Sequence, residues 1–375
     1  MTHAVITGTG LYTPEHAIDN DALVASFNAW VDKENARHAE AIRRGEREPL
    51  AHSSTEFILK ASGIHSRYVL DAEGILDPER MRPRLPQRRD DEHSIQCEMG
   101  MLAAREALDR ARIEASDIDL LIVACSNLER SYPAVAVELQ AALGTRGYAF
   151  DMNVACSSAT FAIETAANAI GNASVCRALV INPEICSAHL NFRDRDSHFI
   201  FGDACTAIVL EADDVATAES RFEILGTRLI TRYSNAIRNN AGFLNRVTDS
   251  DPLAEDKLFV QEGRRVFKEV CPMVAQLITE HLASLQVTGD QLTRLWLHQA
   301  NRHMNDLIAR RVLGAEPAPD QAPIILDRYA NTSSAGSIIA FHLHRDDLKE
   351  GDLGVVCSFG AGYSAGTVLL RKVSV

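Results

Sequence analysis

Three short segments of the chain end an apolar run with a side chain that can take part in catalysis. Cys156 follows the run "DMNVA" and precedes small residues, His298 ends "LWL", and Asn331 stands in "RYANTSSAG". A cysteine at a helix N-terminus faces free backbone N–H groups and the positive end of the helix dipole, which lower the thiol pKa. The pattern therefore predicts a cysteine nucleophile at the start of a helix that runs from Cys156 to about residue 171.

Each of these residues also has a plain structural interpretation. Cys156 fits a buried thiol in a tight strand–helix turn, His298 fits a core histidine, and Asn331 fits an ordinary helix N-cap. A fourth segment, "FGAGYSAG" (359–366), carries glycines that allow an unusual backbone and close approach. Such a loop can present a backbone N–H to an oxyanion, whereas a phosphate loop would need G-K-[ST]. The four segments taken together favour the catalytic interpretation.

The second half of the chain repeats the order of the first half. Corresponding positions lie 174 or 175 residues apart: Ala124 and His298, Cys156 and Asn331, Val180 and Val355. Recurrence of a strand–helix order at one offset predicts two similar α/β halves. Their strands are nearly continuous apolar runs, as expected for sheets covered by helices on both faces. The candidate residues should therefore meet where equivalent strand ends face each other.

Outside the repeat, the pattern predicts an N-terminal strand over 4–9 and a helix over 21–44. An apolar stripe supports this helix, which we expect Asn20 to cap and Gly45 to end. Residues 71–92 are charged and rich in proline, which predicts an exposed loop. A further helix is expected over about 93–112.

Composition limits the classes of function. The 375 residues are 46% hydrophobic and 24% charged, with no apolar run near ~18 residues and no signal peptide, so we expect a cytoplasmic protein off the membrane. The net charge of -13 argues against nucleic-acid binding. Because the same charge repels an acidic protein, docking of such a partner would need a local basic patch. Eight cysteines without a C-x-x-C pair predict neither a metal site nor a disulfide framework.

At its motifs the sequence resembles the thiolase-fold condensing enzymes, and most of all β-ketoacyl-[acyl-carrier-protein] synthase III. The resemblance rests on "VITGTGLYTP", "ASGIHSRYV", "ACSSAT", "FGDACTAIVLE", "HQAN", "NTSSAG" and "FGAGYSAG". It implies two pseudo-symmetric halves in a layered α-β-α-β-α body. Residues 1–215 would carry the cysteine, and residues 216–375 the histidine and asparagine. Long insertions near 28–52 and 71–92 resemble those of a subgroup primed by medium-chain acyl-CoA.

The resemblance also assigns roles. Cys156 would carry the acyl group, His298 and Asn331 would promote decarboxylation, and the backbone N–H groups of Cys156 and Ala361 would form the oxyanion hole. For the CoA or pantetheine arm it indicates Phe57, Arg195 and Asn301. Phe57 stands where relatives have tryptophan and Ala61 where they have arginine, so part of the CoA contact differs in this chain.

Partners follow from the same resemblance. Tyr132 matches an aromatic residue that enters the acyl pocket of the partner subunit, which implies a homodimer. Basic residues for carrier-protein docking would be Lys268, Arg302, Arg310 and Arg311. The arginine pair also fits a cation-rich helix C-terminus before Gly314. No metal or tightly bound cofactor is required.

The implied reaction is a decarboxylative Claisen condensation in fatty-acid biosynthesis. An acyl-CoA, such as octanoyl-CoA, would react with malonyl-acyl carrier protein to give β-ketoacyl-acyl carrier protein. The alternatives are an acetyl-CoA-primed initiating synthase and a head-to-head or polyketide-type condensing enzyme of the same fold. A catalytically silent acyl-binding partner is the non-enzyme alternative.

Overall fold

The computed structural model describes residues 3–249, 251 and 254–374. The strands are β1 (Ala4–Tyr12), β2 (His16–Asp19), β3 (Ser66–Val69), β4 (Leu120–Ala124), β5 (Tyr148–Met152), β6 (Arg177–Ile185), β7 (Asp203–Ala212), β8 (Ser220–Ser234), β9 (Ile237–Arg238), β10 (Val260–Gln261), β11 (Leu292–Leu297), β12 (Leu353–Gly360) and β13 (Gly362–Ser374). The helices are α1 (Asn20–Arg37), α2 (Ala39–Arg43), α3 (Thr55–Ser62), α4 (Ala72–Leu76), α5 (Ile95–Ala111), α6 (Val135–Leu143), α7 (Ser158–Gly171), α8 (Gly263–Ser284), α9 (Arg302–Leu313), α10 (Leu326–Tyr329) and α11 (Ala335–Leu343). Within these ranges, none of the helices combines the length and apolar character needed to cross a bilayer.

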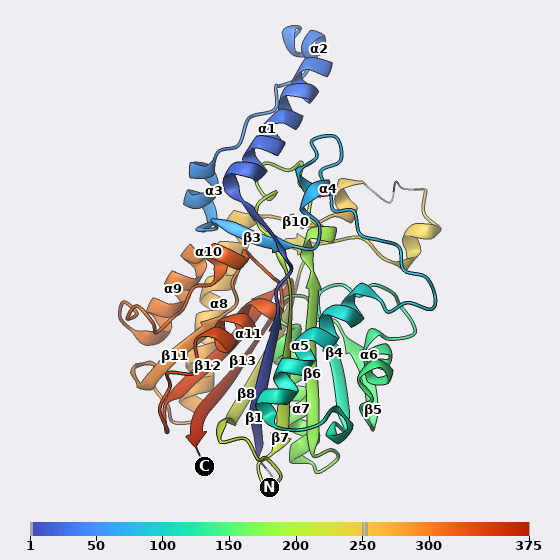
Figure 1. Cartoon of the computed structure of the whole chain (residues 1–375). Coiled ribbons are helices and arrows are strands. Elements are labelled where there is room, and N and C mark those ends of the chain that lie inside the picture. The colour runs from blue at the N-terminus through green and yellow to red at the C-terminus, as the bar shows by residue number, and fades with distance from the viewer. Residues whose placement is uncertain (1–2, 250, 252–253, 375) are drawn as a thin grey trace.

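The main sheet contains the same strand arrangement twice. Its order is β11-β12-β13-β8-β1-β7-β6-β4-β5 (Figure 1). On one side β4 pairs parallel with β6, β6 antiparallel with β7, and β7 antiparallel with β1. On the other side β11 pairs parallel with β12, β12 antiparallel with β13, and β13 antiparallel with β8. The predicted similarity of the two halves is confirmed by this topology, while the boundary at residue 215 stays a prediction.

Helices form three layers around the two halves of the sheet. Along β6, Ala178 and Val180 belong to the central core with α7 and α11, whereas Leu179 and Ile181 belong to the outer core with α5 and α6. The outer face of the second half is covered by α8 and α9. This sequence of layers is the α-β-α-β-α body that the resemblance implied.

The first insertion forms an arm that projects from the body in Figure 1. The helix predicted over 21–44 is divided at His38 into α1 and α2. The predicted cap was wrong, because Asp19 accepts the N–H of Ala22 at 2.8 Å. Asn20 is buried and instead donates to the carbonyl of Ile64 at 2.7 Å, so its side chain ties the arm to the body.

The second insertion, 71–92, was predicted as an exposed loop, but part of it is helical. It begins with the short helix α4, which Asp71 caps by accepting the N–H of Gly74 at 3.0 Å. The same carboxylate accepts the N–H of Arg84 at 2.6 Å. Asp71 therefore closes this part of the insertion into a compact fold.

Candidate active site

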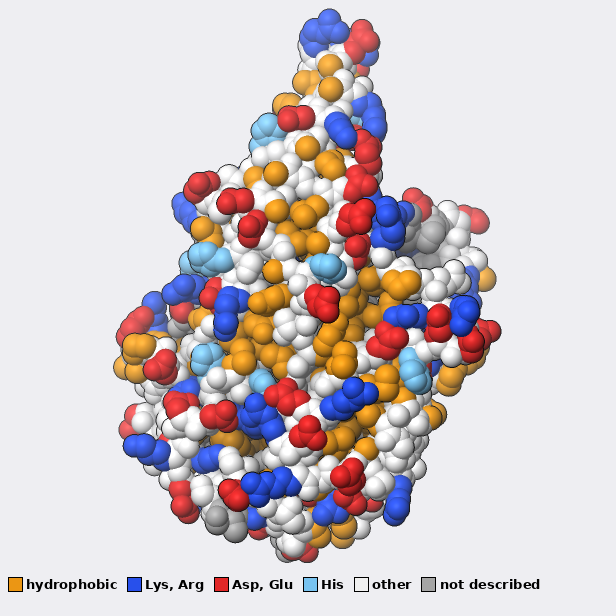
Figure 2. Space-filling view, in the orientation of Figure 1, with side chains coloured by type: hydrophobic (Ala, Val, Ile, Leu, Met, Phe, Trp, Pro, Cys, Tyr) orange, Lys and Arg blue, Asp and Glu red, His pale blue; other side chains and the backbone are white. Residues whose placement is uncertain are grey.

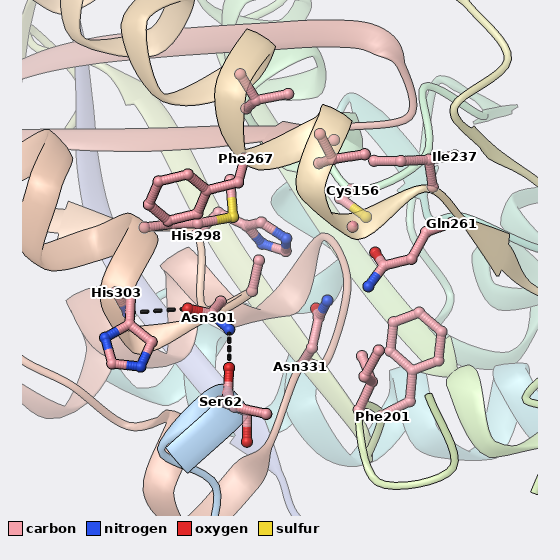
Figure 3. A pocket seen from close by; sticks show the side chains of 18 of the residues that line it. Ser62, Cys156, Phe201, Ile237, Gln261, Phe267, His298, Asn301, His303 and Asn331 are labelled. Atoms are coloured by element: carbon pink, nitrogen blue, oxygen red, sulfur yellow. Dashed lines mark hydrogen bonds between the residues drawn. The ribbon is translucent and has the colours of Figure 1, made fainter. Parts of the chain in front are cut away.

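The three candidate side chains line one cavity. Cys156 and His298 follow strands, whereas Asn331 follows α10, so the expectation that it lies at a strand end is wrong. Cys156 follows β5, and His298 follows β11 with its N–H bonded to the carbonyl of Cys357 at 2.7 Å. Asn331 is fixed by hydrogen bonds of its own N–H and carbonyl to Ile200 (2.9 Å) and Gly202 (3.1 Å). The shared cavity has a volume of about 450 Å³ (Figure 3). Residues far apart in the sequence are thus brought together, and the roles given to them stay predictions.

Backbone groups crowd around the sulfur of Cys156. The N–H groups of Ala361 and of Cys156 itself act on the thiol and lower its pKa. Gly360 approaches so closely that a Cβ atom there would lie 2.9 Å from Sγ. Only glycine leaves room for this contact. The two N–H groups predicted for the oxyanion hole therefore both lie at the nucleophile.

The expectation of an acidic thiol is wrong. Burial raises the pKa of Cys156 to about 11, against the lowering effects of the Ser333 side chain and the two N–H groups. The Glu184 carboxylate raises the pKa further. One reason for the error is that α7 begins at Ser158, two residues beyond the thiol, so the helix terminus acts on Cys156 less directly.

His298 is a neutral imidazole in a dry environment. Burial lowers its pKa to about 4, although the carbonyl of Ser333 opposes this shift. The ring stands edge-on to Phe359, with centroids 5.1 Å apart. Its Nδ1 makes no hydrogen bond to any described residue. The buried ring therefore keeps one nitrogen without a partner among these residues.

Asn331 is held so that one end of its amide is used and the other is available. Its Oδ1 accepts the N–H of Ser333 at 2.9 Å, which leaves Nδ2 as the donor on the cavity side (Figure 3). The alternative of an ordinary N-cap does not describe this geometry, because α11 starts four residues later and Ser334 occupies the cap position. The arrangement suits donation to a substrate oxygen.

Most of the cavity wall was not identified from the sequence. One face of α8 supplies Gly263, Val266, Phe267 and Val270, and Arg264 lies beside them. Their spacing of three and four residues marks a helix face, but the pattern does not tell which surface that face covers. Gln261 of β10 and Met304 of α9 complete this side of the wall.

The predicted CoA residues lie at the border of the cavity. The Arg195 guanidinium lies over the Phe57 ring, 4.1 Å from its centroid, and its Nε donates to the carbonyl of His52 at 2.7 Å. Their neighbours Ala61 and Asp196 line the cavity, whereas Phe57 and Arg195 do not. A ring inserted between them would have to separate the pair.

Asn301 does line the cavity, and it also caps α9. Its Oδ1 accepts the N–H of His303 at 2.9 Å, and its Nδ2 donates to the carbonyl of Ala61 at 2.7 Å (Figure 3). Both ends of this amide are therefore engaged in hydrogen bonds within the protein. His303 lines the cavity beside it. Arg302, which was predicted for carrier docking, does not line the cavity, and its stem packs against Gly63.

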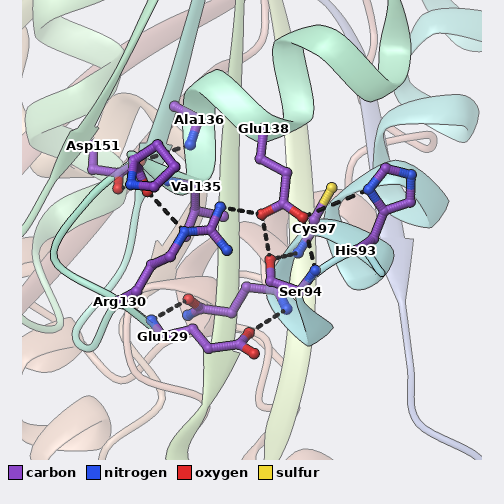
Figure 4. Close-up of polar contacts among 11 residues, drawn as sticks. His93, Ser94, Cys97, Glu129, Arg130, Val135, Ala136, Glu138 and Asp151 are labelled. Carbon is purple, nitrogen blue, oxygen red and sulfur yellow. Dashed lines mark hydrogen bonds and ion pairs between the residues drawn. The ribbon is translucent and has the colours of Figure 1, made fainter. Parts of the chain in front are cut away.

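Tyr132 points away from this cavity and is 85% exposed. The loop that carries it is held by Arg130, which donates to the carbonyl of Pro133 at 2.8 Å and pairs with Glu138 (Figure 4). The predicted acyl-pocket residue is therefore presented outward in a single protomer by a polar network beneath it.

The same network contains three groups with metal-ligating atoms, from His93, Cys97 and Glu138, within 4.8 Å of one another. Glu138 already accepts two hydrogen bonds from Ser94, both at 2.7 Å, and an ion pair from Arg130. Burial and Glu138 together raise the pKa of the Cys97 thiol to about 12. Because the Glu138 carboxylate is already engaged by Ser94 and Arg130, we interpret the cluster as structural.

The basic residues predicted for docking are exposed on two neighbouring helices. Lys268 lies on α8, and the arginines Arg302, Arg310 and Arg311 lie on α9, which contacts α8. Arg310 is paired with Glu316 at 2.6 Å, so part of its charge is compensated. Lys268 follows Phe267, and Arg302 stands between Asn301 and His303; these three neighbours all line the cavity.

Comparison with known proteins gives consistent matches. The profiles of the family described as 3-oxoacyl-[acyl-carrier-protein] synthase III match residues 150–232 and, for its C-terminal part, 282–372. The chain is 62% identical over 347 residues to a β-ketodecanoyl-[acyl-carrier-protein] synthase of Pseudomonas aeruginosa, covering 92% of this chain and 99% of the relative. A β-ketoacyl-[acyl-carrier-protein] synthase III of Acidiphilium cryptum is 31% identical and covers 99% and 100%. The crystal structure of the synthase III from Aquifex aeolicus superimposes with a TM-score of 0.75, at 25% identity and 98% and 99% coverage.

Proposed function

Because the chain belongs to the 3-oxoacyl-[acyl-carrier-protein] synthase III family of acyltransferase-type condensing enzymes, we propose that it condenses an acyl-CoA with malonyl-acyl carrier protein. The product is a β-ketoacyl-acyl carrier protein for fatty-acid synthesis. The observation that carries the proposal is the shared cavity of Cys156, His298 and Asn331. Thiol, imidazole and amide supply the groups that both half-reactions need, so the proposed chemistry uses no metal and no tightly bound cofactor.

The first half-reaction transfers the acyl group to the enzyme. The Cys156 thiolate attacks the thioester carbonyl, and the sulfur of CoA leaves and takes up a proton. The negative oxygen that forms is stabilised by the N–H groups of Cys156 and Ala361. The thiol must first lose its proton to solvent, and the N–H groups of Cys156 and Ala361 favour the thiolate that remains.

The second half-reaction forms the carbon–carbon bond. Malonyl-acyl carrier protein binds, its carboxylate leaves as carbon dioxide, and the electron pair remains as an enolate at the thioester. His298 and Asn331 donate to the enolate oxygen. The enolate carbon then attacks the acyl group, and the Cys156 sulfur leaves as thiolate.

A medium-chain primer such as octanoyl-CoA is supported by the 62% identity to a protein named for a β-ketodecanoyl product. Eight primer carbons and two from malonate make a ten-carbon product. Mass spectrometry of the intact protein after incubation with acetyl-, octanoyl- or decanoyl-CoA tests this. We expect the octanoyl adduct on Cys156 and none on a Cys156→Ser variant. Adducts with acetyl-CoA alone would establish the acetyl-primed alternative instead.

Release of carbon dioxide separates the remaining alternatives. The proposed reaction releases one carbon dioxide per product and depends on malonyl-acyl carrier protein. Head-to-head condensation of two acyl groups would not depend on the malonyl carrier. A silent acyl-binding protein would form no covalent adduct at Cys156.

We also propose a homodimer. Hydrophobic side chains gather across the middle of the face shown in Figure 2. On the protomer surface Leu102 of α5 and Val137 of α6 are exposed together with Tyr132, which is more than these apolar residues usually show in a monomer. Light scattering with size-exclusion chromatography tests the dimer. Tyr132→Ala should lengthen the acyl chains accepted if Tyr132 enters the partner's pocket, because the smaller side chain leaves more room.

A cytoplasmic location belongs to the same proposal. All eight cysteines are free, as expected in a reducing compartment.

A further inference from the structure

Glu184, at the end of β6, is a buried carboxylate that no role assigned so far uses. It is 1% exposed. Burial raises its pKa, and the hydrogen bonds it accepts oppose this. It forms no ion pair with any described residue, so an acidic group is held in the protein interior by hydrogen bonds alone. Burying a charged group costs free energy, so we ask which parts of the protein this carboxylate holds in place.

The carboxylate joins the two halves of the protein at the site. From the first half, Ser126 donates its N–H at 3.0 Å and its hydroxyl at 2.5 Å. From the second half, Ser334 donates its N–H at 3.1 Å and also its hydroxyl. The two backbone N–H groups can only donate, which matches a carboxylate that only accepts.

The contact with Ser334 fixes the segment that carries Asn331. Ser333, the residue before Ser334, has a φ angle of 49° and donates its N–H to Oδ1 of Asn331. A short chain of contacts therefore runs from Glu184 through Ser334 and Ser333 to the Asn331 amide. It determines which end of that amide faces the cavity.

We infer that Glu184 is a positioning residue for decarboxylation, which acts by holding Ser334 and so orienting Nδ2 of Asn331 toward the enolate oxygen. This inference rests on the proposed function. Acyl transfer to Cys156 uses the N–H groups of Cys156 and Ala361, which lie on other segments. Glu184 and Ser333 act on this step only through the pKa of the thiol, which Glu184 raises and Ser333 lowers. Loss of the Glu184 contact should therefore impair the second half-reaction and spare the first.

Glu184→Gln tests this with little change of shape. In wild type both carboxylate oxygens accept hydrogen bonds, whereas in the variant one of them is replaced by an NH₂ group that cannot accept, so the contact on that side is lost. Octanoyl transfer to Cys156 is followed by intact-protein mass spectrometry, and decarboxylation by release of labelled carbon dioxide from malonyl-acyl carrier protein. We expect acyl transfer at least as fast as in wild type, because loss of the Glu184 charge favours the Cys156 thiolate. Decarboxylation should fall about 100-fold, as expected when a catalytic group is misplaced. Equal losses in both, or full decarboxylation, would overturn the inference.

Two further variants separate positioning from stability. Ser334→Ala removes a hydroxyl on the Asn331 side of the carboxylate, and Ser126→Ala removes the matching one on the other side. We expect Ser334→Ala alone to lower decarboxylation selectively, and equal effects of the two would contradict the inference. Glu211→Gln is the control, since Glu211 is buried at the opposite end of the β6–β7 pair and bonded to Arg177 at 2.8 Å.

The same measurements distinguish failure of the inference from failure of the proposed function. If wild-type protein forms no octanoyl adduct or releases no carbon dioxide, the proposed function fails and the inference falls with it. If wild type performs both steps and Glu184→Gln loses both alike while still folded, only the inference fails. Where Glu184→Gln does not fold, Ser334→Ala decides the question.

Discussion

Ala155 and Ala330 lie 175 residues apart, and both have positive φ angles, 48° and 53°, directly before a residue of the cavity. The backbone therefore turns sharply before Cys156 in the first half and before Asn331 in the second. A non-glycine residue in this region costs about 1–3 kcal/mol and is kept only where its surroundings impose it. The two halves use the same strained turn to present different chemistry.

Substitution of Ala155 tests whether this turn presents the nucleophile. Ala155→Val should lower the free energy of unfolding by about 1–3 kcal/mol and slow acylation of Cys156, because a β-branched residue tolerates positive φ poorly. Ala155→Gly, which accepts the conformation, should stay within about 1 kcal/mol of wild type. Urea unfolding and mass spectrometry of the acyl-enzyme measure both effects. An Ala155→Val protein as stable and reactive as wild type would show that the turn is unimportant.

The raised pKa of Cys156 predicts how its reactivity depends on pH. Below a pKa of about 11 the thiolate fraction grows with pH, so alkylation of Cys156 by iodoacetamide should accelerate about tenfold per unit between pH 7 and 10. His298 contributes no step in this range, since its pKa is near 4. Rates from a Cys156→Ser protein correct for the other thiols. If the alkylation rate reached a plateau below pH 8, the thiol would be acidic, as expected from the sequence.

The fold was predictable where the sequence repeats and where apolar runs are long. The run "RALVINPEI" coincides with β6, and the helix expected over 93–112 forms α5. The cap of α1 was misassigned because Asn20 finds a tertiary partner, the carbonyl of Ile64, that no local pattern reveals. Tertiary contacts decide such choices between neighbouring capping residues.

The site was predictable because Cys156 and His298 follow strands and because Asn331 occupies the position equivalent to Cys156, although it follows the helix α10. The 175-residue offset brought Cys156 and Asn331 together, but it carried no information about how deeply the thiol is buried. Burial depends on packing of distant segments, and it reversed the expected direction of the pKa shift. Glu184 escaped notice for the same reason, because a glutamate at a strand end looks like any surface residue until its two serine partners are placed.

The stacked pair Phe57 and Arg195 predicts a selective loss of CoA affinity. Arg195→Ala should raise the KM for octanoyl-CoA about tenfold with a smaller change in kcat, because the pair would contact the nucleotide and not the reacting atoms. With octanoyl-pantetheine, which lacks the nucleotide, the variant should match wild type. Arg193→Ala is the control, since Arg193 lies over Trp30, 5.8 Å from its centroid, and both residues line a separate cavity. Equal effects on both thioesters would remove the pair from the nucleotide site.

Charge reversal at Lys268 tests carrier docking on a protein whose net charge is -13. Lys268→Glu should raise the KM for malonyl-acyl carrier protein about tenfold at low salt, and the effect should shrink in ~0.5 M salt, where charges are screened within a few ångströms. Acylation by octanoyl-CoA should not change, because that step involves no protein partner. Lys349→Glu is the matched control: Lys349 is exposed and precedes β12, at the sheet end opposite the cavity. If both charge reversals raise the KM for the carrier protein equally, the attraction depends on overall charge and α8 is not the docking surface.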